Sequence, residues 1–236
     1  LELDKIANDT IEAMGGKSNF QLVPGYHHTI CSSINEEVVH GIPNAGRILQ
    51  AGDLVSIDAG AIIEGWNGDS AISVVVPGGD PALAAKRQRL SDVTEESLWR
   101  GIAALAKGKR LNDVGTAIEK YINSQGKFGI LEQYVGHGIG RSMHEDPPVF
   151  NYEVRGLTPK IQPGLVVAIE PMVTAGTEIT KVLDDDWTVS TIDGSDASHW
   201  EHTVAVHAGG IWVLTAPDGG AERLAKLGVT IAPLGE

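Results

Sequence analysis

The sequence predicts an α+β protein in which two related halves share one β-sheet. Three segments repeat apolar residues at helical spacing, and short β-rich runs lie between them. Two ten-residue segments also resemble one another, which is typical of a duplicated half-domain. With 236 residues, 42% of them hydrophobic, the chain can bury a core as one large domain or as two small ones.

Three helices are predicted from apolar periodicity and from residues that begin or end helices. The first covers about residues 2 to 14 and ends at a glycine pair, Gly15-Gly16. The second begins after Asp80-Pro81, a side-chain cap followed by a proline suited to the first turn, and ends near Gly108. The third covers about residues 112 to 126.

Strands are predicted between these helices. The clearest β-rich runs are residues 54–63, 71–76, 165–169 and 204–206. They complete the α+β pattern.

The internal resemblance joins residues 49–58 to residues 161–170. Both segments share Gln, Gly, Val and Ile at matching places, and each closes on an acid, Asp58 or Glu170. Two unrelated strands that each follow a glycine turn would explain ten residues equally well. The matching acids favour duplication, with halves at roughly 1–110 and 111–220 of a single domain that covers residues 1–236. A pseudo-twofold axis would then place Asp58 and Glu170 equivalently, with a site between the halves.

Composition excludes several classes of protein. Eighteen Lys and Arg against 31 Asp and Glu give a formal charge of -13, which repels phosphate backbones and anionic lipids, so no nucleic-acid or membrane partner is expected. The only cysteine, Cys31, permits neither an intrachain disulfide nor a thiolate zinc site. No run of about 18 apolar residues and no signal-peptide pattern is present, so we expect a cytoplasmic protein.

Two acids fall in a predicted hairpin. Asp58 ends one β-rich run, and Asp69 follows a turn-like segment at residues 64–68. An even-length loop would place both carboxylates on one face, because side chains alternate with period two. Such a pair requires a cation or an unusual pKa. Two solvated aspartates at strand ends are the alternative.

Two further acids and a histidine complete a candidate metal site. Glu170 and Glu201 lie in apolar β-like surroundings, where a lone carboxylate is costly, and His137 stands between glycines. Together the four acids would carry about four negative charges, which two divalent cations would balance, with His137 as the one nitrogen ligand. Such donors suit Mn, Fe, Co or Zn without choosing among them. Paired metals of this kind serve hydrolysis.

A series of motifs in order along the chain supports this interpretation. They are Cys31-x-Ser-x-Asn35-Glu36, Val39-His40-Gly-Ile-Pro43, Ser56-Ile-Asp58, Gly68-Asp69, Gly136-His137-Gly-Ile-Gly140, Met143-His144-Glu-Asp-Pro147, Ile169-Glu170-Pro-Met172, Asp186-Trp187-Thr-Val189 and Glu201-His-Thr203. With these motifs the chain resembles the type I methionine aminopeptidases, a family of the pita-bread fold, from about Leu3 to Pro217. That fold has two pseudo-twofold-related halves around a central antiparallel sheet, with helices on its outer face.

The resemblance implies a role for each matching residue. Asp58 and Asp69 would chelate or bridge the metals, His137 and Glu170 would hold one metal, and Glu201 would bridge. Glu170 would also shuttle protons, and His40 and His144 would flank the site, touch the substrate and polarise its carbonyl. The side chains expected to line the methionine pocket are Cys31, Tyr26, Met143 and Trp187. The remaining histidines are expected to be structural or on the surface: His27, His28, His199, His202 and His207.

The implied activity is removal of the initiator methionine from new proteins whose second residue is small, by attack of metal-activated water. Substrates would be N-terminal methionine peptides, the enzyme would be a monomer, and docking on the ribosome stays open. X-Pro aminopeptidases and prolidases share the fold and ligands and are the alternative, as is a non-catalytic binding module. The short segment between His144 and Glu170 favours type I over type II.

The chain departs from the family pattern in two places. Val23 stands where the family commonly has an aromatic residue, which changes one edge of the pocket. The first helix of the family is not found in the chain, so we expect an N-terminal segment ahead of Leu1.

Overall fold

The computed structural model, which describes residues 1–234, confirms the α+β class with a curled antiparallel sheet. Four α-helices cover Glu2–Ala13 (α1), Pro81–Lys107 (α2), Asn112–Gln125 (α3) and Ala221–Lys226 (α4), with a 3₁₀ turn at Phe20–Leu22. The strands are Lys17–Ser18 (β1), Ile30–Ile34 (β2), Glu37–Val39 (β3), Leu54–Ile63 (β4), Trp66–Val75 (β5), Gly129–Ile130 (β6), Gly136–Gly138 (β7), Glu145–Val149 (β8), Val166–Ile169 (β9), Met172–Thr174 (β10), Thr180–Val182 (β11), Val189–Thr191 (β12), Ala197–His199 (β13), Glu201–His207 (β14) and Gly210–Val213 (β15).

The three long helices match their predicted positions. Asp80 caps α2 by accepting hydrogen bonds from the backbone N–H groups of Ala82 (2.7 Å) and Leu83 (3.0 Å), and Pro81 occupies its first turn. Gly126 follows α3 with φ 137°, a conformation that favours glycine. Local sequence therefore suffices to place these helices.

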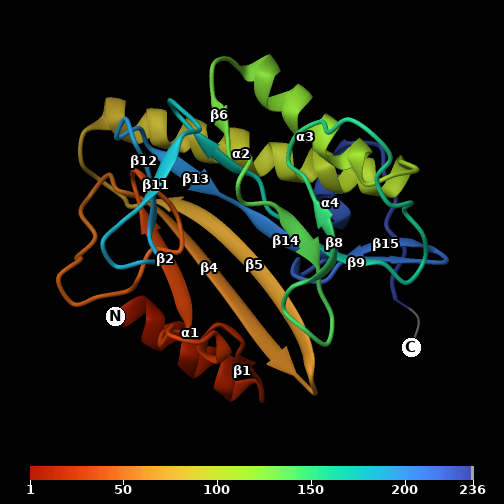
Figure 1. Ribbon diagram of the computed structural model, residues 1–236, viewed down its shortest axis with the longest axis horizontal. Coiled ribbons are helices and arrows are strands. Elements are labelled where there is room, and N and C mark those ends of the chain that lie inside the picture. Colours follow the sequence, from red (N-terminus) through yellow and green to blue (C-terminus); the bar gives the residue numbers. More distant parts are fainter. Residues whose placement is uncertain (235–236) are drawn as a thin grey trace.

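The central sheet has nine strands in the order β1-β4-β5-β14-β9-β7-β8, with β2 on β4 and β15 on β14. Helices α2 and α3 lie together over one face of this sheet (Figure 1). Apolar side chains from α2, α3, β9, β14 and β15 form the main core between these layers. Two three-stranded sheets, β13-β10-β6 and β11-β12-β3, lie beside it.

Two predicted strands are too short. The second predicted strand, residues 71–76, begins at Trp66 in the structure, because the mostly polar segment 66–70 also pairs with β4. The last, residues 204–206, begins at Glu201 in β14. Apolar residues in the sequence locate the buried centre of a strand. They do not reveal the polar residues at its end, which belong to the strand only because their backbone pairs with a neighbouring strand.

The β4–β5 hairpin has the strand register that places Asp58 and Asp69 on one face of the sheet. Ile63 pairs with Trp66 across a two-residue loop, where Glu64 (φ 52°) and Gly65 (φ 81°) both have positive φ. Farther along, Asp58 pairs with Ala71, and Gly60 pairs with Asp69. Asp58 and Asp69 therefore share one face, as the even loop predicts.

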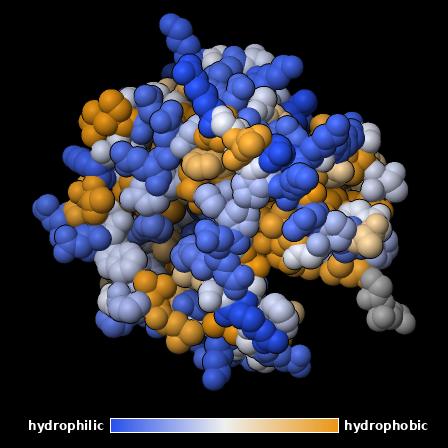
Figure 2. Space-filling model, turned by 45° about the vertical axis from the view of Figure 1, so that its right-hand side comes forward, coloured by the Kyte–Doolittle hydropathy of each residue, from blue (hydrophilic) through white to orange (hydrophobic). Residues whose placement is uncertain are grey.

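Within residues 1–234, the helices fall short of a membrane span in length or in apolarity. Among residues 1–234, none of the helices, including the 27-residue α2, combines the length and the apolarity needed to cross a membrane. Figure 2 shows polar side chains over much of one face, with apolar side chains in separate groups between them.

Candidate active site

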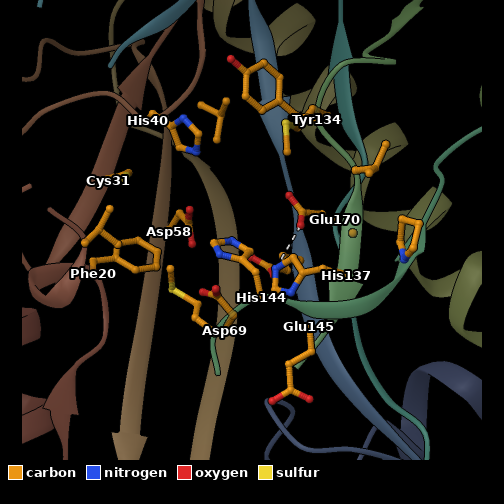
Figure 3. A pocket seen from close by; sticks show the side chains of 18 of the residues that line it. Phe20, Cys31, His40, Asp58, Asp69, Tyr134, His137, His144, Glu145 and Glu170 are labelled. Atoms are coloured by element: carbon orange, nitrogen blue, oxygen red, sulfur yellow. Dashed lines mark ion pairs between the residues drawn. The ribbon is translucent and has the colours of Figure 1, made fainter. Parts of the chain in front are cut away.

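Five strands or strand ends bring the predicted metal ligands to one cavity of about 440 Å³. Asp58 lies on β4, Asp69 on β5, His137 on β7 and Glu201 on β14, while Glu170 directly follows β9. Glu170 and His137 face Asp58 and Asp69 across the cavity (Figure 3). The structure thus gathers residues 143 positions apart in sequence, which supports the grouping of all five.

Three of these side chains are placed so that one ion could contact all of them. Single ligand atoms of Asp69, His137 and Glu201 all lie within 4.8 Å of one another. Nε2 of His137 is 3.5 Å from Oε1 of Glu170, and Asp58 lines the same cavity without joining the group of three. A cation bound among them would meet oxygen donors and one imidazole nitrogen.

The four carboxylates are buried without cationic partners. They are between 2% and 9% exposed, and none of the lysines or arginines of residues 1–234 lines the cavity. Burial raises the pKa of each carboxyl, and the charge of Asp69 raises the pKa of the other three further. Oδ1 of Asp58 and Oε1 of Glu201 are buried with no hydrogen-bond partner among the described residues. Unpartnered buried oxygens of this kind fit a cation site.

The His137 ring is oriented for a cation. Its Nδ1 lies 2.9 Å from the carbonyl oxygen of Gly138, which can only accept, so Nδ1 carries the proton. The lone pair of Nε2 is left to face the carboxylates. Burial lowers the pKa of His137, which keeps the ring neutral as a ligand must be.

The glycines beside His137 are required by close strand packing. A Cβ on Gly136 would lie 2.3 Å from the carbonyl oxygen of Ala168, and one on Gly138 would lie 2.2 Å from that of Asp146. These neighbours are backbone atoms, which cannot rotate away. Glycines on both sides of His137 therefore let β7 pack closely against its neighbouring strands.

Side-chain hydrogen bonds hold the backbone of two of these acids, Asp69 and Glu170. The hydroxyl of Thr203 accepts a hydrogen bond from the N–H of Asp69 and donates one to its carbonyl oxygen. The side chain of Asn151 donates to the carbonyl oxygen of Glu170 at 3.1 Å. Both partners come from the second half of the chain.

A second part of the cavity is apolar and aromatic. Tyr26 and Cys31 form a small buried cluster with Phe20, against which Met143 and Trp187 pack. The rings of Tyr26 and Trp187 lie 5.0 Å apart. Burial, with a smaller contribution from the charge of Asp58, raises the pKa of the Cys31 thiol, so it remains neutral and acts as a small apolar group.

His40 and His144 both line the cavity, as predicted. His40 has φ 62°, a strained conformation for a residue with a side chain, and its ring packs edge-to-face on Tyr134 at 5.5 Å. The ring of His144 lies 4.4 Å from that of His137. Burial lowers the pKa of both His40 and His144, so each is a neutral imidazole with one N–H near pH 7.

Tyr134 and His199 are among the residues in or beside the site that were not identified from the sequence. Tyr134 lines the cavity three residues before His137, a spacing that the Gly-His-Gly motif alone does not mark. His199, expected to be a satisfied structural or surface histidine, is buried with its Nε2 3.8 Å from Glu170 and unpartnered by any hydrogen bond among the described residues. Its buried position agrees with a structural histidine, but its Nε2 lacks the expected hydrogen-bond partner and points to Glu170 instead, because the face of β13 that carries His199 is set by pairing with β10, which the local sequence does not reveal.

The other four histidines lie outside the cavity, as expected. His202 contacts the Thr215 hydroxyl, His207 the carbonyl oxygen of Ala232 and His28 the carboxylate of Asp4, whereas His27 is exposed. Val23, the departure from the family pattern, lines the cavity beside Tyr26.

Comparisons with known proteins agree with this site. Residues 1–208 match the metallopeptidase family M24. Methionine aminopeptidase 1 of Mycobacterium tuberculosis is 50% identical over 223 residues, covering 91% of this chain and 81% of that protein. Methionine aminopeptidase 1 of Bacillus subtilis is 42% identical over 214 residues, covering 91% of this chain and 84% of that protein.

Solved structures give the same result. The crystal structure of methionine aminopeptidase from Thermotoga maritima superimposes with a TM-score of 0.85 at 37% identity, over 91% of this chain and 84% of that one. A prolidase from Pyrococcus furiosus superimposes with a TM-score of 0.59 at 22% identity, over 80% of this chain and 49% of that one. The second likeness shows the fold alone.

Proposed function

The chain belongs to the metallopeptidase family M24, and from this premise we propose that it removes the initiator methionine from proteins whose second residue is small. One observation carries the proposal: four buried carboxylates with no lysine or arginine of residues 1–234 beside them, together with His137, lie at one end of a cavity whose other wall is apolar and aromatic. The first part suits a hydrolytic metal centre, and the second suits a thioether side chain.

We assign the metal site to Asp58, Asp69, His137, Glu170 and Glu201, and we propose that it holds two divalent ions. Four negative charges with no cationic side chain to balance them favour two ions over one. Mn, Fe, Co and Zn all suit these oxygen and imidazole donors. Ions bound there supply positive charge that acidifies water and offsets negative charge on the amide oxygen.

Protons are moved by the chain's own carboxyl and imidazole groups. Burial raises the pKa of Glu170, which suits this carboxylate to accept a proton from the attacking water and return it to the departing amine. The neutral imidazoles of His40 and His144 would each donate their single N–H to the scissile carbonyl oxygen as it gains charge. Both line the cavity beside the acids.

The methionine side chain would occupy the apolar wall. Tyr26, Cys31, Met143 and Trp187 pack together there, and the neutral Cys31 thiol adds a polarisable surface without charge. Val23, which stands where the family commonly has an aromatic residue, forms part of this edge of the pocket.

Cleavage of defined peptides distinguishes methionine aminopeptidase activity from the activity of X-Pro aminopeptidases and prolidases. We expect release of free methionine from Met-Ala-Ser and not from Met-Lys-Ser. The second side chain has to fit beside the metal site, and we expect the long lysine side chain not to fit there. Preference for an X-Pro peptide would assign the chain to the X-Pro aminopeptidases or prolidases, which share the fold. Binding of peptide without any cleavage in the presence of metal would indicate a non-catalytic module.

Location and assembly stay predictions. We expect a cytoplasmic monomer acting on nascent chains, in keeping with its single, buried Cys31. Analytical ultracentrifugation of the purified protein measures its mass in solution and so tests whether it is a monomer. Co-sedimentation with ribosomes tests whether it binds them.

A further inference from the structure

The loop between β7 and β8, residues 139–144, carries two side chains of the proposed site. Met143 packs on the methionine pocket, and His144 packs on the ring of His137. The loop itself lies at the surface, with Arg141 and Ser142 exposed. Its two flanking strands are only three and five residues long, so they constrain the middle of the loop weakly.

The tip of the β4–β5 hairpin holds this loop at its middle. The backbone N–H of Asn67 and its side-chain Nδ2 both donate to the carbonyl oxygen of Gly140, at 2.8 and 3.1 Å. The carboxamide oxygen of Asn67 accepts in turn from the side chain of Asn19 at 3.3 Å, which fixes its orientation.

A second contact joins the same two segments. The guanidinium of Arg141 stacks over the ring of Trp66 at 3.8 Å, and its Nη1 donates to the carbonyl oxygen of Glu64 at 3.0 Å. We name these contacts of Asn67, Trp66 and Arg141 the clasp.

The clasp joins strands that the sheet keeps apart. In the sheet, β5 and β7 are separated by β14 and β9. Pairing of β5 with β14 stops at Ser70 and His202, so residues 66–69 extend beyond it toward the loop. Figure 1 shows the loop after β7 beside the hairpin tip. The clasp is thus a direct contact between the β4–β5 hairpin and the loop after β7, which come from opposite halves of the chain.

We propose that Asn67, Trp66 and Arg141 are positioning residues, which hold the loop so that Met143 closes the methionine pocket and His144 faces the scissile carbonyl. This inference rests on the proposed function. No clasp residue touches substrate; each acts through Met143 or His144. Small misplacements of such groups cost rate steeply, because the reacting geometry tolerates little error.

The test uses Arg141→Ala, Trp66→Ala and Trp66→Phe in the full chain at saturating metal, with Met-Ala-Ser as substrate. Arg141→Ala and Trp66→Ala should each lower kcat by about 10-fold and raise KM, with metal content unchanged. Trp66→Phe retains a ring under the guanidinium and should keep wild-type kcat. Arg155→Ala, which removes an exposed arginine elsewhere on the same half, is the matched control and should change neither constant.

A double variant separates positioning from a general structural role. The clasp is proposed to affect kcat through the imidazole of His144, which His144→Ala removes. Adding Arg141→Ala to that variant should therefore lower kcat no further. It should still raise KM, because the position of Met143 is still disturbed. A further 10-fold fall in kcat in that background, loss of metal, or wild-type constants in Arg141→Ala would overturn the proposal. Wild-type protein that releases no methionine would instead contradict the proposed function itself.

Discussion

The hydroxyl of Thr203 bonds both backbone groups of Asp69, accepting from its N–H at 3.0 Å and donating to its carbonyl oxygen at 2.7 Å. Thr203 lies on β14, two residues after Glu201, and is fully buried. This contact continues the link between β5 and β14 beyond the last paired residues, Ser70 and His202. One side chain therefore sets the distance between two proposed ligands from opposite halves of the chain.

Thr203→Val should weaken metal binding while preserving side-chain shape. The valine leaves the N–H and carbonyl of Asp69 buried without partners, which costs about 1–3 kcal/mol of unfolding free energy. Loss of such an orienting contact lowers metal affinity by about 10–100-fold. Thr94→Val is the control, because that hydroxyl bonds only its own helix at the carbonyl oxygen of Leu90. Calorimetric titration of metal into both variants checks the difference, and equal affinities would remove Thr203 from this role.

Asp69→Asn should lower metal occupancy together with activity. The substitution keeps the volume of the side chain but removes one of four negative charges that face the proposed ions. Metal analysis of the purified variant and its rate on Met-Ala-Ser are the measurements. A variant that binds two metals and turns over normally would show that Asp69 is not a ligand.

The metal-free protein should lose stability as pH rises. Burial raises the folded-state pKa of Asp69 above its unfolded value of about 4, so its stabilising protonated form is lost as pH rises through the folded pKa. Metal-free Asp69→Asn lacks this loss, and its Tm advantage over wild type should grow from pH 5 to pH 8. The buried His199 and His202, with pKa near 3 and near 4, act in the opposite sense below pH 6.5 in both proteins and cancel in the difference. A Tm difference that shrinks with pH would contradict the raised pKa.

His144→Ala should reduce the chemical step without removing metal. Its imidazole lies outside the proposed ligand set and would bond the carbonyl oxygen mainly as charge develops. We expect kcat on a Met-Ala peptide to fall by on the order of 10²-fold, the usual scale for one such donor, at unchanged metal content. Metal loss would move His144 into the ligand set, and an unchanged kcat would leave it with a structural role only.

Gly138→Ala should destabilise the fold around His137. The new methyl group would lie 2.2 Å from the carbonyl oxygen of Asp146, a backbone atom that cannot move without separating β7 from β8. We expect a loss of about 1–3 kcal/mol in unfolding free energy. Gly68→Ala is the control, because a Cβ there meets no described atom within 4 Å. Equal denaturant midpoints for the two variants would show that the close packing at Gly138 is not needed.

The sequence predicts what local rules govern. Capping at Asp80 and the glycine at 126 place helices, and the parity of a two-residue loop places Asp58 and Asp69 on one face. Contacts between segments far apart in the chain could not be predicted from the sequence. Asn67 meets Gly140 across 73 residues, and His199 meets Glu170 through the placement of β13 against β10, which depends on how whole strands pair. No local pattern encodes either contact, because each depends on how segments far apart in the sequence are brought together by strand pairing.

The central claim is that this chain cleaves N-terminal methionine with metal held by the five gathered ligands. The most direct test strips the protein of metal, titrates it with Mn or Co, and measures free methionine released from Met-Ala-Ser against bound metal per chain. The account predicts no release without metal, and release that rises with occupancy to saturate at two ions per chain. Methionine release by the metal-free protein, or none with either metal at full occupancy, would contradict it.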